Sequence, residues 1–359
     1  MNLRECSRSD SFARQGTTEV GTRIFSVVVC VAAFLICCTA LHRALPAPEI
    51  KLVTPKLRHL AQHHVDYDAV FVGSSHVYRG LIPSVFDKVM ADAGQPTHSF
   101  NFGIDGMWPP EQFYLMDRIL ELRPRNWRWV FIELSDVQFK RVPGEEDTQR
   151  DVYWHDWHHT FTVIRKLLDL NSPGNWKRKK GGLVRWHGAV WMHLELLCRN
   201  LANVGGAQAA LDGFARWGNE RAGGDSDLGP AGDGYDPVDV HLDAPAARSF
   251  EAWLARDVAN SKPRIVDPYA EKAFLNYARR FRALGATPIF FTAPGSMSLL
   301  PSKFRSPSAP PIMVFNDPVT FPALYRAEFR WNEGHVNDAG AHEYSRVFAR
   351  RVLSLETGK

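Results

Sequence analysis

The sequence has few cysteines, and their positions exclude two kinds of architecture. Only five occur in 359 residues, and Cys30, Cys37 and Cys38 all fall in one apolar run near the N-terminus. Cys6 precedes that run, which leaves Cys198 as the single cysteine in the body of the chain. The body therefore has neither a disulfide framework nor a cysteine-rich metal site. We expect no metal ion and no other cofactor.

The sequence also lacks a strong excess of charge. It contains 43 Lys and Arg residues against 39 Asp and Glu residues, which gives a formal net charge of +4. Nucleic-acid-binding domains usually carry a much larger positive excess, so any basic surface here must be local. We expect no nucleic-acid partner.

One long apolar run is present, and it lies close to the N-terminus. Residues 24–41 contain no charged side chain, a length at the lower edge of a membrane-spanning helix. No small-residue cleavage site follows, because Arg43 and prolines come directly after the run. An uncleaved anchor over residues 24–42 is thus preferred to a removed signal peptide. Residues 1–23 would precede it as a tail, and residues 43–66 would follow as a stalk ending in a short helix.

Beyond residue 66, strand and helix patterns alternate. Apolar runs at 67–73, 99–102 and 127–134 predict buried strands, and helical spacing is found at 83–93 and 110–122. This series predicts a doubly wound α/β fold with a parallel sheet, whose first half covers residues 67–138. Its second half, 263–359, has a helix at 269–284, a strand at 287–292 and a helix at 339–353. Residues 139–262 interrupt the alternation as a largely helical insertion, in which the Gly/Asp-rich segment 223–236 predicts a long mobile loop.

Two polar segments stand where such a sheet would bring chemistry together. Ser75 follows the first strand behind Gly73, and ligands of open α/β sheets bind at the carboxyl ends of the strands. His335 precedes the last helix, and Asn332 stands three residues before it. A histidine there could accept the serine proton while Asn332 orients the ring, as acyl transfer requires. Taken alone, the Gly-Ser-Ser segment is more often an ordinary loop.

Three blocks resemble those of the SGNH/GDSL hydrolase family in order and spacing. FVGSSHVYRG (71–80) is similar to the nucleophile block, NFGIDG (101–106) to the second block, and WNEGHVN (331–337) to the last. The resemblance implies a flavodoxin-like, three-layer α/β sandwich. It also implies that Ser75 is the nucleophile and His335 the base, and that the backbone N–H groups of Ser75 and Gly106 form the oxyanion hole.

The sequence departs from the family pattern at two supporting positions. Val137 stands about where the family has the Asn of its third block, which completes the oxyanion hole, and a lost donor of that kind costs on the order of 10²–10³ in rate. Ser135 and Gln138 are the candidate substitutes for that donor. Asn332 replaces the usual Asp, a change that lowers turnover by about 10⁴ in another serine enzyme. Glu333 is a candidate for the missing charge.

Two residues after the nucleophile leave their roles open. His76 and Arg79 are candidates for substrate contact, although Arg79 is equally suited to a structural salt bridge. A separate group, His155, Asp156, His158 and His159, has some metal-ligand types at helical spacing. The interleaved Trp154 and Trp157 favour an amphipathic packing segment instead.

An anchored SGNH domain with a Gly-Ser-Ser block resembles a particular subgroup of the family. Its members act beside membrane-bound O-acyltransferases in teichoic-acid D-alanylation and exopolysaccharide acetylation. The resemblance implies a single-pass protein in the cytoplasmic membrane, with residues 1–23 in the cytoplasm and the α/β domain facing the periplasm or cell exterior. It implies a serine esterase or acyltransferase acting on acyl esters, such as acetyl, of envelope glycans, with weak or partner-dependent activity. The alternatives are a non-catalytic accessory or glycan-binding protein that partners a multi-pass O-acyltransferase, and a soluble periplasmic esterase with a removed N-terminus.

Overall fold

The computed structural model contains one parallel sheet of five strands. It describes residues 22–38, 40, 49–135, 148–168, 182–202, 225–295 and 301–356. The strands are β1 (Ala69–Gly73), β2 (Ser99–Gly103), β3 (Trp129–Glu133), β5 (Thr287–Thr292) and β7 (Ile312–Val314). They lie in the order β2-β1-β3-β5-β7, with every neighbouring pair parallel. Counted within the sheet this is 2-1-3-4-5, a common doubly wound order. The predicted α/β class with a parallel sheet is confirmed.

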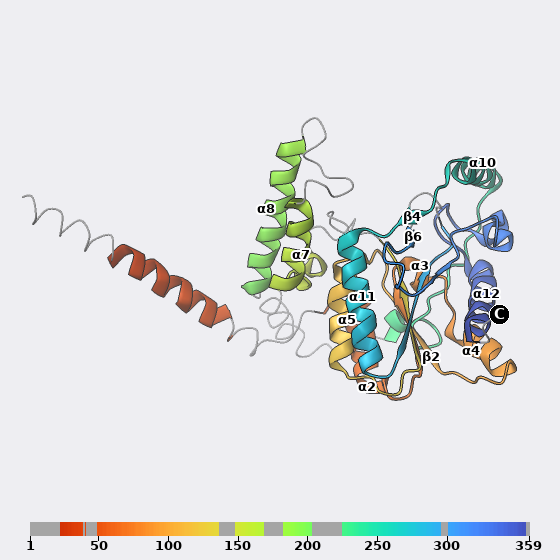
Figure 1. Cartoon of the computed structure of the whole chain (residues 1–359), viewed down its shortest axis with the longest axis horizontal. Helices are drawn as coiled ribbons and strands as arrows, with labels where there is room; N and C mark the ends of the chain where they lie inside the picture. The colour runs from red at the N-terminus through yellow and green to blue at the C-terminus, as the bar shows by residue number, and fades with distance from the viewer. Residues whose placement is uncertain are drawn as a thin grey trace, which may run out of the picture.

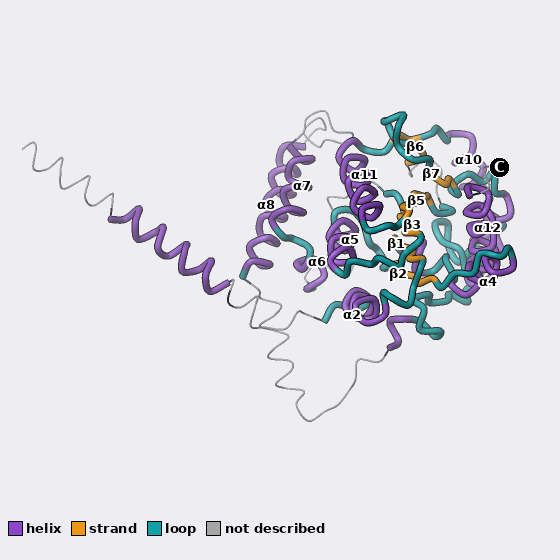
Figure 2. The backbone as a smooth tube through the Cα atoms, turned by 60° about the horizontal axis from the view of Figure 1, so that its bottom comes forward, coloured by secondary structure: helices purple, strands orange, loops and turns teal. Residues whose placement is uncertain are grey.

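Helices cover both faces of the sheet and give three layers (Figures 1 and 2). One face carries α2 (Val53–His63), α5 (Glu111–Glu121) and α11 (Pro268–Ala283). The opposite face carries α4 (Pro83–Asp92) and α12 (Asp338–Glu356). A further helix, α10 (Ala244–Asn260), contacts the short 3-10 helix η4 (Ala327–Phe329) on this second side.

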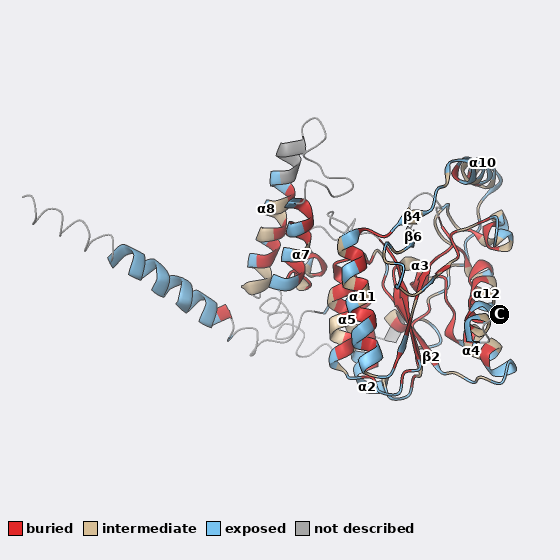
Figure 3. Cartoon of the chain, viewed as in Figure 1, coloured by how far each residue is buried: buried red, intermediate tan, exposed pale blue. Residues whose placement is uncertain are grey.

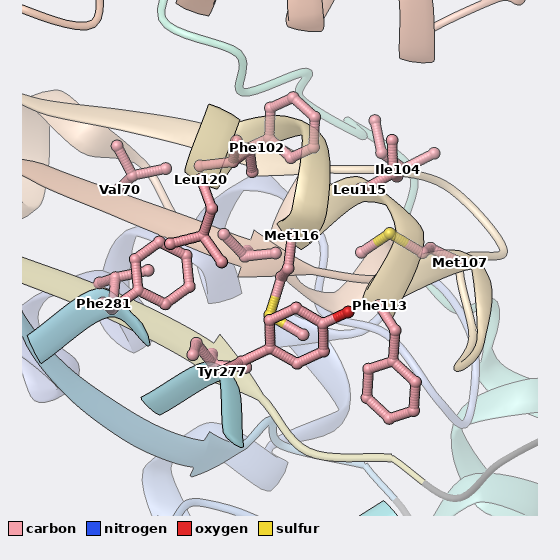
Figure 4. Close-up of a cluster of buried hydrophobic side chains, with 14 of the residues drawn as sticks. Val70, Phe102, Ile104, Met107, Phe113, Leu115, Met116, Leu120, Tyr277 and Phe281 are labelled. Carbon is pink, nitrogen blue, oxygen red and sulfur yellow. The ribbon is translucent and has the colours of Figure 1, made fainter. Parts of the chain in front are cut away.

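The core is divided by the sheet, because side chains alternate along each strand. In β1, Val70 and Val72 pack with the α5 and α11 side, whereas Ala69 and Phe71 pack with the α4 and α12 side. Every residue of β1, β2 and β3 is buried, which explains why these strands are rich in apolar residues, although β2 also buries Ser99 and Asn101. Figure 3 shows the buried sheet between helices whose outer faces are exposed, and Figure 4 shows part of the α5 and α11 cluster.

The strand at the far edge of the sheet, β7, was not predicted. It has only three residues and stands between prolines and a polar stretch, so periodicity gives little signal there. The same applies to the separate parallel pair β4 (Arg264–Ile265) and β6 (Pro301–Lys303), and to the 3-10 helix η3 (Pro322–Tyr325). Of these short elements, β7 extends the five-stranded sheet beside β5, whereas β4 and β6 pair only with each other.

The described part of the predicted stalk belongs to the α/β body. Ile50, Val53 and Leu60 are buried in the same cluster as the strands β1 and β2. Val53 and Leu60 belong to α2, which covers the sheet beside α5. The stalk prediction for 43–66 is corrected here for residues 49–66, because Ile50 and the α2 side chains Val53 and Leu60 are buried in the core of the α/β body.

The Gly/Asp-rich segment, predicted as a mobile loop, lies in order along the edge of β2. The N–H of Asn101 in β2 donates to the carbonyl oxygen of Asp233 at 2.9 Å. Buried Lys56 of α2 donates to the carbonyl oxygens of Asn101, Gly103 and Gly234 at 3.1, 2.7 and 2.6 Å. A Cβ on Gly234 would lie 2.0 Å from the Asn101 oxygen, and its φ of 88° favours glycine. The described residues 225–236 are mostly turns and irregular structure, as predicted, and their hydrogen bonds to Asn101 and Lys56 hold them against the edge of the sheet.

The remaining part of the predicted insertion is helical where the structure describes it. It contains α6 (Gln149–Tyr153), α7 (Trp157–Leu168) and α8 (Gly182–Leu201), and a 3-10 helix η2 (Asp225–Leu228) follows the gap after them. Helices α7 and α8 pack on each other, and α7 also contacts α5. The later part of the predicted insertion packs on the α/β body, since η2 contacts α2 and α10 buries Phe250 in the α4 and α12 cluster.

At the N-terminus, residues 22–38 form a helix whose apolar side chains, such as Phe25 and Ile36, are largely exposed (Figure 3). Across the described ranges, no helix combines the length and the hydropathy that crossing a bilayer would need.

Candidate active site

Ser75 is the first residue of α3 (Ser75–Tyr78), directly after β1. The turn between strand and helix is tight because Gly73 has no side chain. A Cβ there would lie 2.3 Å from the Cγ2 of Val77 and 2.5 Å from the Oε2 of Glu133. The hydroxyl of Ser74 accepts from the N–H of His76 and caps α3. The chain can therefore turn sharply and present the Ser75 side chain at the carboxyl edge of the sheet.

Asn101, a buried residue of the neighbouring strand β2, holds this turn through its side-chain hydrogen bonds. The Nδ2 of Asn101 donates to the carbonyl oxygens of Val77 and Leu81, each at 2.7 Å. Its Oδ1 accepts from the N–H of Gly103 at 2.8 Å. With both donor and acceptor used, Asn101 ties α3 to the end of β2 and limits movement of Ser75.

The loop that carries His335 is held at both of its ends. Arg330 is buried and donates to the carbonyl oxygens of Pro294 and Leu324 at 3.2 and 2.9 Å. Asn337 accepts from the N–H of Gly340 at 3.0 Å, at the start of α12. Residues 330 and 336 also form an isolated β-bridge. Hydrogen bonds thus hold both ends of the short loop that carries His335.

Ser75, His335 and Asn332 form a connected chain of hydrogen bonds. The Oγ of Ser75 lies 2.7 Å from the Nε2 of His335, and the Nδ1 of His335 lies 3.0 Å from the Oδ1 of Asn332. The same Oδ1 accepts from the backbone N–H groups of Gly334 and His335 at 2.8 and 2.9 Å. Because both backbone groups are donors, the atom facing Nδ1 is the carbonyl oxygen and not the amide nitrogen. Nδ1 must then carry the proton, and Nε2 is left to accept from the serine hydroxyl.

The environment of His335 favours its neutral form. Burial, together with the smaller effects of the charges of His76, Arg330 and Arg79, lowers the pKa of His335 to about 3. The imidazole is therefore neutral at neutral pH. Asn332 orients the ring but would add no negative charge to stabilise an imidazolium if His335 took up a proton.

A second pair, Glu133 and His76, lies beside the first. Glu133 ends β3 and is buried, its Oε2 accepts from the N–H of Ser74 at 2.6 Å, and its Oε1 lies 3.1 Å from the Nδ1 of His76. The ring of His76 stacks on that of His335. The sequence prediction missed Glu133, although an acidic residue that ends the apolar strand pattern WVFIE was a usable signal.

The other predicted residues have different environments. Arg79 forms a salt bridge with the carboxylate of Asp236 at 2.5 Å, which matches the second of its two predicted roles, a structural salt bridge. Gly106 lies in the loop after β2 with φ of 66°, at the same edge of the sheet as Ser75. Glu333 is exposed, and the Nδ1 of His335 is bonded to Asn332 instead. Val137 and Gln138 lie outside the described residues.

The surface around Ser75 is shallow. Among the described residues, those lining it include Ser75, Pro294, His335 and Tyr344, and the depression that they form is too small for a water molecule. Tyr344 is buried, and burial together with the Glu133 charge raises the pKa of its hydroxyl well above the usual value. The described part of the site therefore offers room at the surface but no deep channel for a long acyl chain.

The histidines considered for a metal are engaged otherwise. His159 is buried with its Nδ1 2.8 Å from Asp156 and its Nε2 3.2 Å from Asp117. The Nε2 of His155 lies 2.9 Å from the Nδ1 of His193. Within the described ranges, no group of three or more His, Cys, Asp or Glu side chains is arranged to hold a metal ion.

Comparison with known proteins adds no relative. No family model, no curated protein and no solved structure matches the chain. The site geometry and the three sequence blocks are therefore the features that bear on function.

Proposed function

We propose that the protein is a serine esterase or acyltransferase of the SGNH type, with Ser75 as nucleophile and His335 as base. The observation that carries this proposal is the ordered chain Ser75 Oγ, His335 Nε2, His335 Nδ1 and Asn332 Oδ1, in which Asn332 enforces the reactive tautomer. The 2-1-3-4-5 strand order, which flavodoxin-like folds share, also supports the family assignment.

The first half of the reaction forms an acyl-enzyme. The Oγ of Ser75 attacks the carbonyl carbon of the ester while its proton moves to the Nε2 of His335. The negative charge that develops on the carbonyl oxygen is stabilised by the backbone N–H groups of Ser75 and Gly106. The tetrahedral intermediate then collapses, the ester C–O bond breaks, and His335 returns the proton to the leaving alkoxide.

The second half transfers the acyl group to a hydroxyl. His335 takes a proton from water or from a glycan hydroxyl, whose oxygen attacks the acyl carbon. The bond between the acyl carbon and the Oγ of Ser75 then breaks, and His335 returns the proton to that Oγ. The proposed acyl group, acetyl, comes from the family resemblance alone. The substrate proposed from the family resemblance is an acyl ester of a cell-envelope glycan or exopolysaccharide.

The proposed location and partner follow from the sequence. The apolar run at 24–41 supports an anchor in the cytoplasmic membrane, with the α/β domain on the periplasmic or outer side. A multi-pass O-acyltransferase in the same membrane is the proposed partner, since the resembling subgroup works beside such enzymes.

Covalent labelling tests the nucleophile directly. The full-length protein, purified in a neutral detergent, is treated with a fluorophosphonate probe, and the adduct is mapped by peptide mass spectrometry. Labelling is expected at Ser75 in the wild type and is expected to vanish in Ser75→Ala. The matched control is Ser84→Ala, which removes an exposed serine on α4 and leaves labelling intact.

A non-catalytic accessory protein is the second candidate, and Asn332 is the observation that favours it. A neutral orienting group leaves the imidazolium without a counter-charge, and the pKa of His335 near 3 makes it a weak base. This candidate predicts no adduct and no hydrolysis of aryl acetates, together with co-purification of the acyltransferase by the Ser75→Ala variant. An adduct confined to Ser75 would exclude it.

A further inference from the structure

A cavity of about 340 Å³ lies between α7 and α11, on the face of the sheet covered by α5. Its volume falls in the range of small-ligand sites. Phe113 of α5 and Tyr277 of α11 line it, and their rings stack with centroids 5.6 Å apart (Figure 4). Ser75 and His335 do not line this cavity, so it is a second site with its own chemistry.

Three cationic side chains from two helices line the cavity. Arg165 comes from α7, and Lys272 and Arg279 come from α11. Within the described part of the chain, none of the three forms an ion pair, and Arg279 donates to the Oδ1 of Asn276, which also lines the cavity. Like charges placed around one hollow repel each other unless an anion lies between them.

The acidic residues nearby are already engaged. Asp117 pairs with Arg280 and lies 3.2 Å from the Nε2 of buried His159, while Asp156 lies 2.8 Å from its Nδ1. Hydrogen bonds from His159 and Arg280 help to lower the pKa of Asp117 to about 2 against the effect of its burial. These carboxylates therefore neutralise His159 and Arg280, and the charge of the three cations is left for a ligand.

We infer that this cavity between α7 and α11 binds a phosphate-bearing group. A phosphate monoester carries up to two negative charges on several oxygens, and two arginine forks with one lysine suit that number of acceptors. A single carboxylate has one charge and two oxygens, so it pairs fully with only one guanidinium. The stacked rings of Phe113 and Tyr277 would pack against the organic part of the ligand.

The phosphate can come from a soluble ester or from a lipid headgroup. Trp157 and Phe161 of α7 are exposed and stacked on each other at 5.8 Å. They neighbour the lining residues His158 and Thr162 in sequence. Exposed aromatic side chains beside cations are typical of a surface that meets lipid headgroups. A soluble ester and a lipid headgroup would present the same phosphate group to the cavity. The affinities of the protein for a soluble phosphate ester and for a phospholipid distinguish the two sources.

Binding is tested on the full-length protein in a neutral detergent by isothermal titration calorimetry. The probes are glycerol 3-phosphate, dihexanoyl phosphatidic acid and, as the carboxylate comparison, glucuronate. The double variant Arg165→Gln/Arg279→Gln removes two exposed cations that form no ion pair in the described structure, so folding should be retained and is checked by circular dichroism. The matched control, Arg282→Gln, removes an exposed arginine of α11 that does not line the cavity.

The expected result is saturable binding of a phosphate ester that weakens at least tenfold in the double variant and less than twofold in Arg282→Gln. Tighter binding of the phosphatidic acid would identify a lipid headgroup as the source, and equal binding a soluble ester. Absence of saturable binding, equal binding by the double variant, or glucuronate binding as tightly as the phosphates would overturn the inference. Labelling of Ser75 is unaffected by any of these outcomes, so the two proposals stand or fall separately.

Discussion

The ring of His76 lies stacked on the ring of His335, with centroids 4.6 Å apart and planes inclined by 17°. Each ring has its own oxygen partner: Glu133 lies 3.1 Å from the Nδ1 of His76, and Asn332 lies 3.0 Å from the Nδ1 of His335. The charged partner thus belongs to the histidine whose ring does not face the Ser75 hydroxyl. His335, which does face that hydroxyl, has a neutral partner in Asn332.

The pH dependence of turnover should be shifted to acid. Burial lowers the pKa of His335 to about 3, so the neutral base persists far below the usual histidine range. We expect kcat/KM for aryl acetates to stay flat from pH 7.5 down to about pH 5, whereas a base with an ordinary histidine pKa of about 6.5 would lose most activity there. An inflection near pH 6.5 would contradict the assigned environment of His335. Ester hydrolysis without enzyme is subtracted at each pH.

Restoring a carboxylate at position 332 should increase turnover. The Oδ1 of Asn332 already accepts from two backbone N–H groups and from His335, so Asn332→Asp keeps the geometry and adds charge. We expect kcat to rise at least tenfold, because the reverse change in another serine enzyme costs about 10⁴. The pKa of His335 should rise as well, so the acid limb of the pH profile should move to higher pH.

The control for that experiment is Glu333→Gln. Glu333 neighbours Asn332 in sequence but is exposed, so removing its charge should leave kcat within twofold. A folded Asn332→Asp protein with unchanged or lower kcat would argue that the imidazolium is not the charge that limits the reaction.

Glu133 should support the site by positioning Ser74 and His76. Glu133→Gln replaces one carboxylate oxygen by an NH2 group. That NH2 group then faces either the Ser74 N–H, which is itself a donor, or the ring of His76. We expect the free energy of unfolding to fall by about 1–3 kcal/mol, because a buried donor loses its acceptor. Thermal unfolding measures this change, and kcat should fall about tenfold with KM nearly unchanged. Glu251→Gln on the exposed face of α10 is the matched control and should alter neither quantity.

Lys56 should be required for stability at the edge of the sheet. Its ammonium donates to three backbone carbonyl oxygens, so Lys56→Met would leave those acceptors buried without a partner. The expected loss is about 2–4 kcal/mol in the free energy of unfolding, measured by urea denaturation. Lys88→Met removes only an exposed ion pair with Asp92 and should cost less than about 0.5 kcal/mol. Equal effects of the two changes would contradict the structural role of Lys56.

The parts of the fold that the sequence predicted are those with a long, regular pattern. The strands β1, β2, β3 and β5 were found within two residues of their predicted ends, because continuous apolar runs are typical of strands buried on both faces. The edge strand β7 and the pair β4 and β6 have two or three residues each, too few for any period to be visible.

The segment 225–236 shows why composition was a poor guide. Its glycines and aspartates suggested mobility, yet Gly234 is required by its approach to the Asn101 carbonyl, and Asp236 accepts from Tyr78 and Arg79. The sequence alone does not distinguish a glycine needed for a close contact from a glycine in a free linker. The distinction appears only when the neighbouring strand, here β2, is in place.

The sequence by itself determined the α/β class and proposed Ser75 and His335 from the two ends of the domain, because strand periodicity and the residue types at strand and helix ends are local properties. The tertiary structure decided what those residues do to each other. It placed the Nε2 of His335 2.7 Å from the Oγ of Ser75. It fixed the tautomer through the Oδ1 of Asn332, which accepts from the backbone N–H groups of Gly334 and His335, and it paired the buried carboxylate of Glu133 with His76. Such relationships depend on distance and burial across 260 residues of chain, which no local pattern records.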